Sequence, residues 1–166
     1  MRATAIATTA ILWLSGIASI TPLSVVNADV KCYGGAFNAQ FNPGVTFKNQ
    51  TIQVAASGDL GVCQSSESSK ITGGAFNFVG SNMGSCPGPF AVGYGELQIK
   101  WSDESIITIP QMSFKAEAFT WSLDGQFEGK NVSVNGRATI SPIDIGAQCA
   151  TSGLTNYAGS IDAFVF

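Results

Sequence analysis

The sequence contains no histidine, and this absence removes several kinds of active site. Ser-His-Asp and Cys-His arrangements both use an imidazole as the base, so this chain can build neither. A phosphate-binding loop is also missing, and Gly93-Tyr94-Gly95 is not a dinucleotide fingerprint because it lacks the third glycine and a following helix. We therefore expect a protein that is not an enzyme, unless two carboxylates form a catalytic pair.

Charged residues are scarce as well, at 11% of the chain, and the formal net charge is −3. A sparse, acidic charge is unsuited to nucleic acid and to anionic membrane surfaces. Metal sites are not expected, because the chain has no C-x-x-C pair and its acids are too scattered for a calcium loop. The sequence thus predicts no cofactor and no metal. Its 19 glycines and its many Ser, Thr, Val, Ile and Phe residues are typical of an extracellular all-β domain.

The first 28 residues have the features of a secretory signal peptide that is removed. Arg2 provides a positive start, an apolar run follows, and Val26 and Ala28 occupy the positions that signal peptidase reads. A membrane anchor is the alternative, but Thr and Ser dilute the apolar run and Pro22 interrupts it. We expect cleavage after Ala28, which leaves residues 29–166 as a single secreted domain with no membrane contact.

Four cysteines follow the predicted cleavage site, namely Cys32, Cys63, Cys86 and Cys149. An even number of cysteines in an exported chain indicates two disulfides. A hairpin near residues 42–44 would bring Cys32 and Cys63 to one end of the sheet, so we favour that pair. Cys86 would then join Cys149, provided that residues 106–123 form two strands; as one long kinked strand they would place Cys149 at the Cys32 end.

The clearest structural pattern lies in residues 96–109. Leu97, Ile99 and Trp101 alternate with polar residues, and residues 106–109 continue the alternation after a turn at residues 102–105. A period of two residues indicates a β-hairpin with one dry face and one wet face. Trp101 therefore belongs to the core, and Trp121, in register with Phe119 and Leu123, belongs there too.

Similar segments predict an all-β domain, either an antiparallel β-sandwich or a flattened β-barrel of about eight strands. Shifts in the phase of the apolar face predict bulges near Pro110-Gln111 and near Ala118. No window has helical periodicity, so the segment holding Cys149 is expected to be a loop. The strand candidates are residues 30–41, 47–57, 70–79, 90–101, 106–123, 132–140 and 157–166, with a turn at Asn42-Pro43-Gly44.

One internal repeat is present. Residues 31–38 (KCYGGAFN) and 70–77 (KITGGAFN) agree at six of eight positions, and the similarity fades on both sides. The two copies either line one site or occupy similar surroundings in the sheet, and we expect the second. Any binding site is expected on the glycine-rich segments around Gly34 and Gly73, or on the loops holding Cys63 and Cys86.

Tyrosines and acids supply the other candidate residues. Tyr33, Tyr94 and Tyr157 have small neighbours in the sequence and are expected to be exposed rings for surface binding. A catalytic pair would have to come from the carboxylates, although most are predicted on wet faces or in turns. These carboxylates are Glu96, Asp103, Glu117, Asp124, Glu128 and Asp144.

Two N-glycosylation sequons begin at Asn49 and Asn131, each beside a predicted turn. A eukaryotic secretory pathway is expected to modify at least one of them, which would make the chain a glycoprotein. In a bacterial source both would be accidental.

The spacing of glycines, turns and cysteines resembles a group of small secreted cysteine-containing β-proteins predicted in actinobacteria and some fungi. The segments that carry the resemblance are Cys32-x-Gly34-Gly35, Pro43-Gly44, Gly61-Val62-Cys63, residues 84–88 (GSCPG), Trp101-Ser102-Asp103, Phe127-Glu128-Gly129 and the late Cys149. The resemblance covers most of residues 29–166. It implies an exported β-domain and carries over no site residue.

The sequence therefore predicts a secreted, disulfide-bonded, non-catalytic β-protein that acts by binding or by structural interaction outside the cell. The partner is expected to be an extracellular protein or a glycan, and the chain is expected to be a monomer. A carbohydrate-binding module-like protein is the first alternative. A carboxylate-dependent hydrolase is the second.

Overall fold

The computed structural model describes residues 29–66, 70–86, 91–117 and 119–166. The predicted signal peptide lies outside this range. Ten strands and one helix are described: β1 (Val30–Tyr33), β2 (Gly35–Val45), β3 (Gln50–Asp59), β4 (Val62–Ser65), β5 (Gly74–Gly84), β6 (Ala91–Trp101), β7 (Ile106–Ala116), β8 (Thr120–Phe127), β9 (Lys130–Ala138), α1 (Pro142–Ala150) and β10 (Leu154–Val165).

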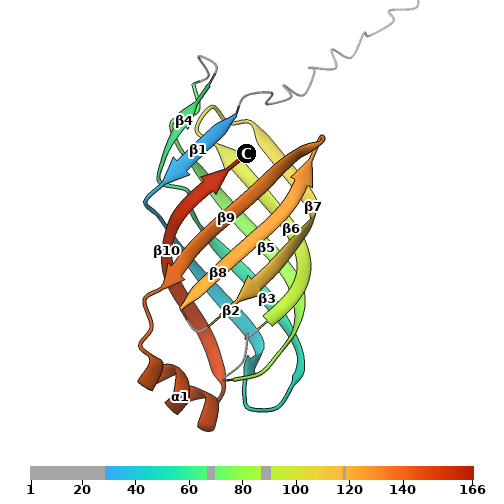
Figure 1. Cartoon of the computed structure of the whole chain (residues 1–166), viewed down its shortest axis with the longest axis vertical. Coiled ribbons are helices and arrows are strands. Elements are labelled where there is room, and N and C mark those ends of the chain that lie inside the picture. Colours follow the sequence, from blue (N-terminus) through green and yellow to red (C-terminus); the bar gives the residue numbers. More distant parts are fainter. Residues whose placement is uncertain (1–28, 67–69, 87–90, 118) are drawn as a thin grey trace, which may run out of the picture.

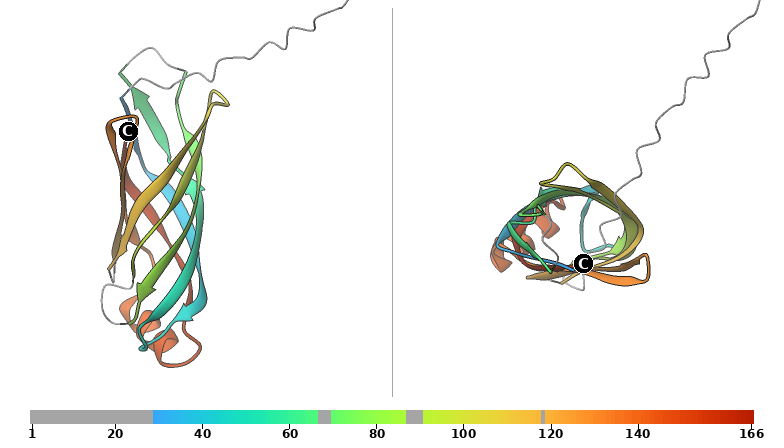
Figure 2. Two further views of the ribbon diagram at one scale, coloured as in Figure 1. Left: turned by 90° about the vertical axis from the view of Figure 1, so that its right-hand side faces the viewer. Right: turned by 90° about the horizontal axis from the view of Figure 1, so that it is seen from above.

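Eight antiparallel strands close into a barrel (Figure 1). The order runs β2-β3-β5-β6-β7-β8-β9-β10, and β10 pairs with β2 to complete the ring, which is visible from above in Figure 2. The two short strands extend the sheet, since β1 pairs with β10 and β4 pairs with β1. Of the two architectures that the sequence predicted, the structure is thus the barrel.

Successive side chains of a strand point alternately into the barrel and out to solvent, and the inward side chains are apolar. The alternating burial along β2 illustrates this pattern. Trp101, Tyr157 and Phe78 are the largest of the fully buried side chains. Phe37 contacts Trp121 with ring centroids 4.5 Å apart, which joins β2 to β8 across the interior. A packed interior leaves the outer face of the sheet as the surface available to a partner.

The hairpin predicted from residues 96–109 is confirmed. Leu97, Ile99 and Trp101 point into the barrel from β6, and Leu97 and Ile99 lie opposite Ile109 and Ile107 of β7. The bulge at Pro110-Gln111 is confirmed too: both residues of β7 are exposed, and the register shifts there between Gly95 and Leu97 of β6. Pro110 suits this position because it has no N–H to donate.

Two predicted bends take a different form in the structure. The phase change near Ala118 is not a bulge within one strand, because β7 ends before it and β8 begins after it, with Glu117 N–H donating to the Thr120 carbonyl at 2.7 Å. Ala118 itself lies outside the described residues. Asn42-Pro43-Gly44 is not a turn but part of β2, with a cis Asn42–Pro43 peptide, and the chain reverses at residues 46–49 instead.

Residues 142–150 form a helix where a loop was predicted. Ser141 caps α1 by accepting a hydrogen bond from Asp144 N–H at 3.1 Å, and Pro142 occupies the first turn. This Ser-x-x-Asp pattern is visible in the sequence, but α1 buries only Ile145 and Cys149, and one pair at i, i+4 spacing is too short a pattern to predict a helix. No helix in the described part of the chain is long and apolar enough to span a bilayer.

Both disulfide pairs predicted from the sequence are confirmed. Cys32 of β1 and Cys63 of β4 are directly opposite each other, and their bond fastens the two added strands. Cys86 and Cys149 join the segment after β5 to α1. The second pair is possible because residues 106–123 contain two strands, which was the condition that the sequence left open.

Candidate binding surface

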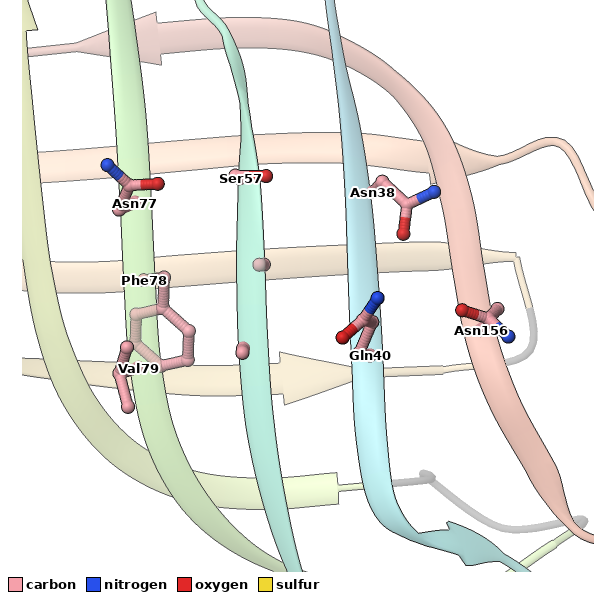
Figure 3. A pocket seen from close by; sticks show the side chains of 9 residues that line it. Asn38, Gln40, Ser57, Asn77, Phe78, Val79 and Asn156 are labelled. Atoms are coloured by element: carbon pink, nitrogen blue, oxygen red, sulfur yellow. The ribbon is translucent and has the colours of Figure 1, made fainter.

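A shallow depression of about 360 Å³ lies on the outer face of the barrel, over β10, β2, β3 and β5 (Figure 3). Its polar lining consists of four amides and one hydroxyl: Asn38, Gln40, Asn77, Asn156 and Ser57. The volume lies at the lower end of the range for ligand pockets, about 300–1,000 Å³.

The depression forms over β3, because the outward-facing side chains of this strand are short. Ala55 and Ser57 of β3 form the floor, because every second residue of a strand points to the same face. The longer side chains of Asn38 and Gln40 stand on β2 on one side, and Asn77 and Val79 stand on β5 on the other. The depression is therefore a groove that follows β3.

The internal repeat contributes one residue to each wall of this groove, Asn38 to one and Asn77 to the other. Asn38 of β2 is opposite Ser57 of β3, and Ser57 is opposite Asn77 of β5. Because β2 and β5 are each antiparallel to β3, the two copies run parallel and in the same register. Two strand spacings place the Asn38 and Asn77 backbones about 10 Å apart. The expectation that the copies merely occupy similar surroundings is thus incomplete, since they also line one depression.

Packing explains the phenylalanines and Gly35 of the repeat. Phe37 and Phe76 point inward on either side of Gly58, where a Cβ atom would lie 2.8 Å from the Phe76 ring and 2.1 Å from the Ala36 carbonyl oxygen. At Gly35 a Cβ atom would lie 2.1 Å from the Asp59 carbonyl oxygen. No side chain fits at Gly35 of the repeat or at Gly58 between the two copies, so Gly35 and the two phenylalanines serve the barrel itself.

Packing does not explain the asparagines. Asn38 and Asn77 are exposed, and within the described part of the chain neither their side chains nor those of Gln40 and Ser57 have a hydrogen-bond partner. Asn156 donates to its neighbour Thr155 Oγ1 at 3.1 Å. The groove thus presents amide donors and acceptors that a ligand can reach without breaking contacts inside the barrel.

Apolar side chains continue the surface beyond the β5 wall. Val79 and Met83 of β5 are exposed, and Tyr94 of β6, which is opposite Ser81, is 70% exposed. Tyr94 lies diagonally across from Val79, close enough for a long side chain to reach it. The amide groove therefore borders an exposed aromatic ring.

Two of the three predicted tyrosines are exposed. Tyr94 belongs to the surface just described, and Tyr33, 49% exposed, lies opposite Val62 where β1 pairs with β4. The structure does not bring these two rings into one depression.

The prediction that the Tyr157 ring is exposed is wrong, because this side chain is only 1% exposed. It points into the barrel from β10, where its ring centroid lies 5.8 Å from that of Phe37, and burial raises the pKa of its phenol to about 12. Its hydroxyl donates to the Glu117 carbonyl at 3.3 Å. Small neighbours in the sequence suggested access, but they do not determine which face of a strand a side chain occupies.

The six carboxylates considered for catalysis are all exposed, and none lines the groove. Glu117 pairs with Lys115 at 2.7 Å. The Ser105 hydroxyl donates to Asp103 at 2.6 Å, and this hydrogen bond holds the pKa of Asp103 below its usual value. The residues that the structure describes include no group of three potential metal ligands.

The two sequon asparagines are exposed. Asn49 lies where the chain reverses between β2 and β3, and Asn131 faces outward from β9. Asn131 accepts a hydrogen bond from Gln126 at 3.3 Å. Neither residue lines the groove.

No protein family, curated protein or solved structure matches this chain. The groove is therefore assessed by its own chemistry. Two other hollows contain charged side chains: Lys115 and Glu117, which pair with each other, line one, and Asp29 and Lys31 line the other. Of these three hollows in the described part of the chain, the groove combines a neutral lining, uncommitted amides and one residue from each copy of the repeat.

Sequence reasoning identified the repeat but not the groove. Asn38 and Asn77 are the last residues of the two copies, yet their proximity depends on β3 pairing with both β2 and β5. Nothing in the sequence indicated that a binding surface would include Gln40, Ser57 and Asn156, because polar residues are common on the solvent-exposed face of a strand.

Proposed function

We propose that this chain is an exported, non-catalytic binding protein whose binding surface is the groove along β3. The observation that carries the proposal is the placement of Asn38 and Asn77, which are equivalent residues of a repeat, expose uncommitted amides and flank the same serine. A closed barrel supports it, because paired strands fix the backbone that carries these side chains and so reduce the entropy lost on binding.

The groove chemistry favours binding over catalysis. Its lining offers amides and the Ser57 hydroxyl, with no carboxylate or amine that could act as a general acid or base. A serine without an adjacent base is a weak nucleophile. The carboxylate-dependent hydrolase is therefore the weaker alternative.

Export is part of the proposal. Two disulfides indicate that the chain folds in an oxidising compartment, and residues 1–28 have the pattern of a removable leader. Expression of the full chain in a secreting host tests this by mass spectrometry of the medium. We expect a protein that begins at Asp29, with glycan on exposed Asn49 or Asn131 in a eukaryotic host. Retention of the full chain in the cell would contradict export.

The binding proposal is tested by retention of the purified protein on washed insoluble matrices. Cellulose, chitin and β-1,3-glucan represent glycans, and gelatin represents extracellular protein. Depletion of the protein from the supernatant measures binding, and release of soluble sugar or peptide measures catalysis. The variants are Asn38→Ala/Asn77→Ala in the groove and Asn135→Ala, an exposed amide on β9, as the matched control.

We expect at least one matrix to retain the wild type and the Asn135→Ala variant but not the double variant. No soluble sugar or peptide should be released from it. Circular dichroism and thermal unfolding of the three proteins should agree, because all three positions are exposed. Retention by no matrix, equal retention of the double variant, or product release that tracks the groove would each overturn the proposal.

A further inference from the structure

Resting on this proposed function, we infer that the ligand is a neutral, hydroxyl-rich glycan chain that lies along β3 between Asn38 and Asn77. The inference concerns the class of ligand, which the binding proposal leaves open. Its basis is the shape of the groove, the hydrogen-bonding capacity of its lining and the pairing of the strands beneath it.

The groove suits a narrow, extended chain. Its floor is the row Ala55 and Ser57, and its walls stand about 10 Å apart at the backbone on β2 and β5. Along β3 the floor continues to Gln53, which donates to Ser81 Oγ at 3.3 Å, and in the other direction to Asp59, which accepts from Gly61 N–H at 3.1 Å. These two internally bonded side chains mark the ends of the uncommitted stretch.

The lining matches hydroxyl groups. Each primary amide carries two N–H donors and a carbonyl acceptor, and a sugar hydroxyl both donates and accepts. Asn38, Gln40 and Asn77 therefore offer paired donors and acceptors to successive hydroxyls. A charged ligand would lose part of its hydration on binding, and the neutral lining has no opposite charge to compensate for that loss. Binding of an anion or a cation is therefore unfavourable.

The strands beneath the groove argue against an extended peptide. Peptides in that conformation bind to sheets by adding a strand at an open edge. Each strand that forms the groove is already paired on both sides: β2 with β10 and β3, β3 with β2 and β5, and β5 with β3 and β6. A peptide could contact side chains only, whereas a glycan needs no backbone partner.

The experiment is isothermal titration with soluble probes, of which the glycans are of similar length. Cellohexaose, laminarihexaose and chitohexaose are neutral, oligogalacturonate is an anionic glycan, and gelatin is the protein probe. Each probe is titrated into the wild type, the Asn38→Ala/Asn77→Ala variant and the Asn135→Ala control. The titration with the neutral oligosaccharide that binds most tightly is then repeated at ionic strengths from about 0.05 to 0.5 M.

We expect a neutral oligosaccharide to bind, with an affinity about tenfold weaker in the double variant because two hydrogen-bonding side chains are lost. The affinity should be unchanged in the control and should not depend on salt. Oligogalacturonate should bind more weakly than the neutral probe.

Other outcomes separate this inference from the proposed function. If gelatin binds through the groove and no neutral oligosaccharide does, the binding function stands and the glycan inference is wrong. A preference for oligogalacturonate, or an affinity that falls steeply with salt, would also overturn the inference. If no probe and no matrix depends on Asn38 and Asn77, both proposals fall together.

Discussion

Asn38 and Asn77 lie opposite the same residue, Ser57, from the two strands that flank β3 on the outer face of the barrel. The chain reaches this arrangement by repeating five residues, Gly-Gly-Ala-Phe-Asn, on two parallel strands. Gly35 and the phenylalanine of each copy serve the packing of the barrel, and the asparagine faces solvent. One repeat therefore has a structural part and a surface part.

Tyr94 is expected to contribute to the binding of longer ligands only. Its ring is exposed on β6 opposite Ser81, which in turn is opposite Gln53 at one end of the groove, so a chain that continues past this end and crosses β5 can cover the ring. Tyr94→Ala should weaken binding of a neutral hexasaccharide about threefold to tenfold, and of a disaccharide not at all. Titrations with a series of oligosaccharide lengths measure this. An equal loss at every length would place the ring inside the groove instead.

Two glycine substitutions are expected to change stability in opposite directions. At Gly136 a Cβ atom would lie 2.1 Å from the Ser160 carbonyl oxygen and 2.8 Å from Trp121 Nε1, so Gly136→Ala should lower the free energy of unfolding by about 1–3 kcal/mol. At Gly146 in α1 nothing lies within 4 Å, so Gly146→Ala should raise it by about 1 kcal/mol. Urea denaturation measures both, and two effects of the same sign would contradict the packing described here.

The sequence predicted best the faces of strands and both disulfide pairs, and it missed the helix α1 and the contacts that depend on closure of the barrel. The alternation of Leu97, Ile99 and Trp101 determines a face locally, and two exposed residues in succession at Pro110-Gln111 reveal a bulge. By contrast, the burial of Tyr157 depends on β10 pairing with β2, a contact between the two ends of the described chain. The groove depends on similarly distant pairing, so the sequence identified Asn38 and Asn77 as parts of a repeat but did not predict that they lie close together.

Tyr157 should make stability fall at alkaline pH. Burial raises its pKa from 10.0 to about 12, so the folded state binds the phenolic proton more tightly than the unfolded state. The stabilisation is complete below pH 10 and is lost as the pH rises through about 12, by about 2–3 kcal/mol.

The measurement is the free energy of unfolding of the wild type and of Tyr157→Phe at pH 8, 10 and 12, with short incubations that preserve the disulfides. The wild type should lose stability relative to the variant above pH 10. Parallel curves for the two proteins would show that Tyr157 is not buried as described.

The two disulfides should contribute similar stability. Cys86–Cys149 closes a longer segment than Cys32–Cys63, with a sequence separation of 63 against 31, so its loss should cost slightly more. Replacing either pair by alanine should lower the free energy of unfolding by about 3–5 kcal/mol. Chemical denaturation of both variants measures this. A variant as stable as the wild type would show that its bridge does not constrain the unfolded chain.

In the proposed complex the amides of the groove along β3 contact the ligand. Two-dimensional NMR of the side-chain amide groups, recorded during titration with the neutral oligosaccharide that binds best, tests this most directly. We predict that the signals of Asn38, Gln40 and Asn77 shift together with one saturation curve, while those of Asn131 and Asn135 on β9 do not move. Shifts at the β9 amides, or saturable binding without change at Asn38 and Asn77, would contradict the account.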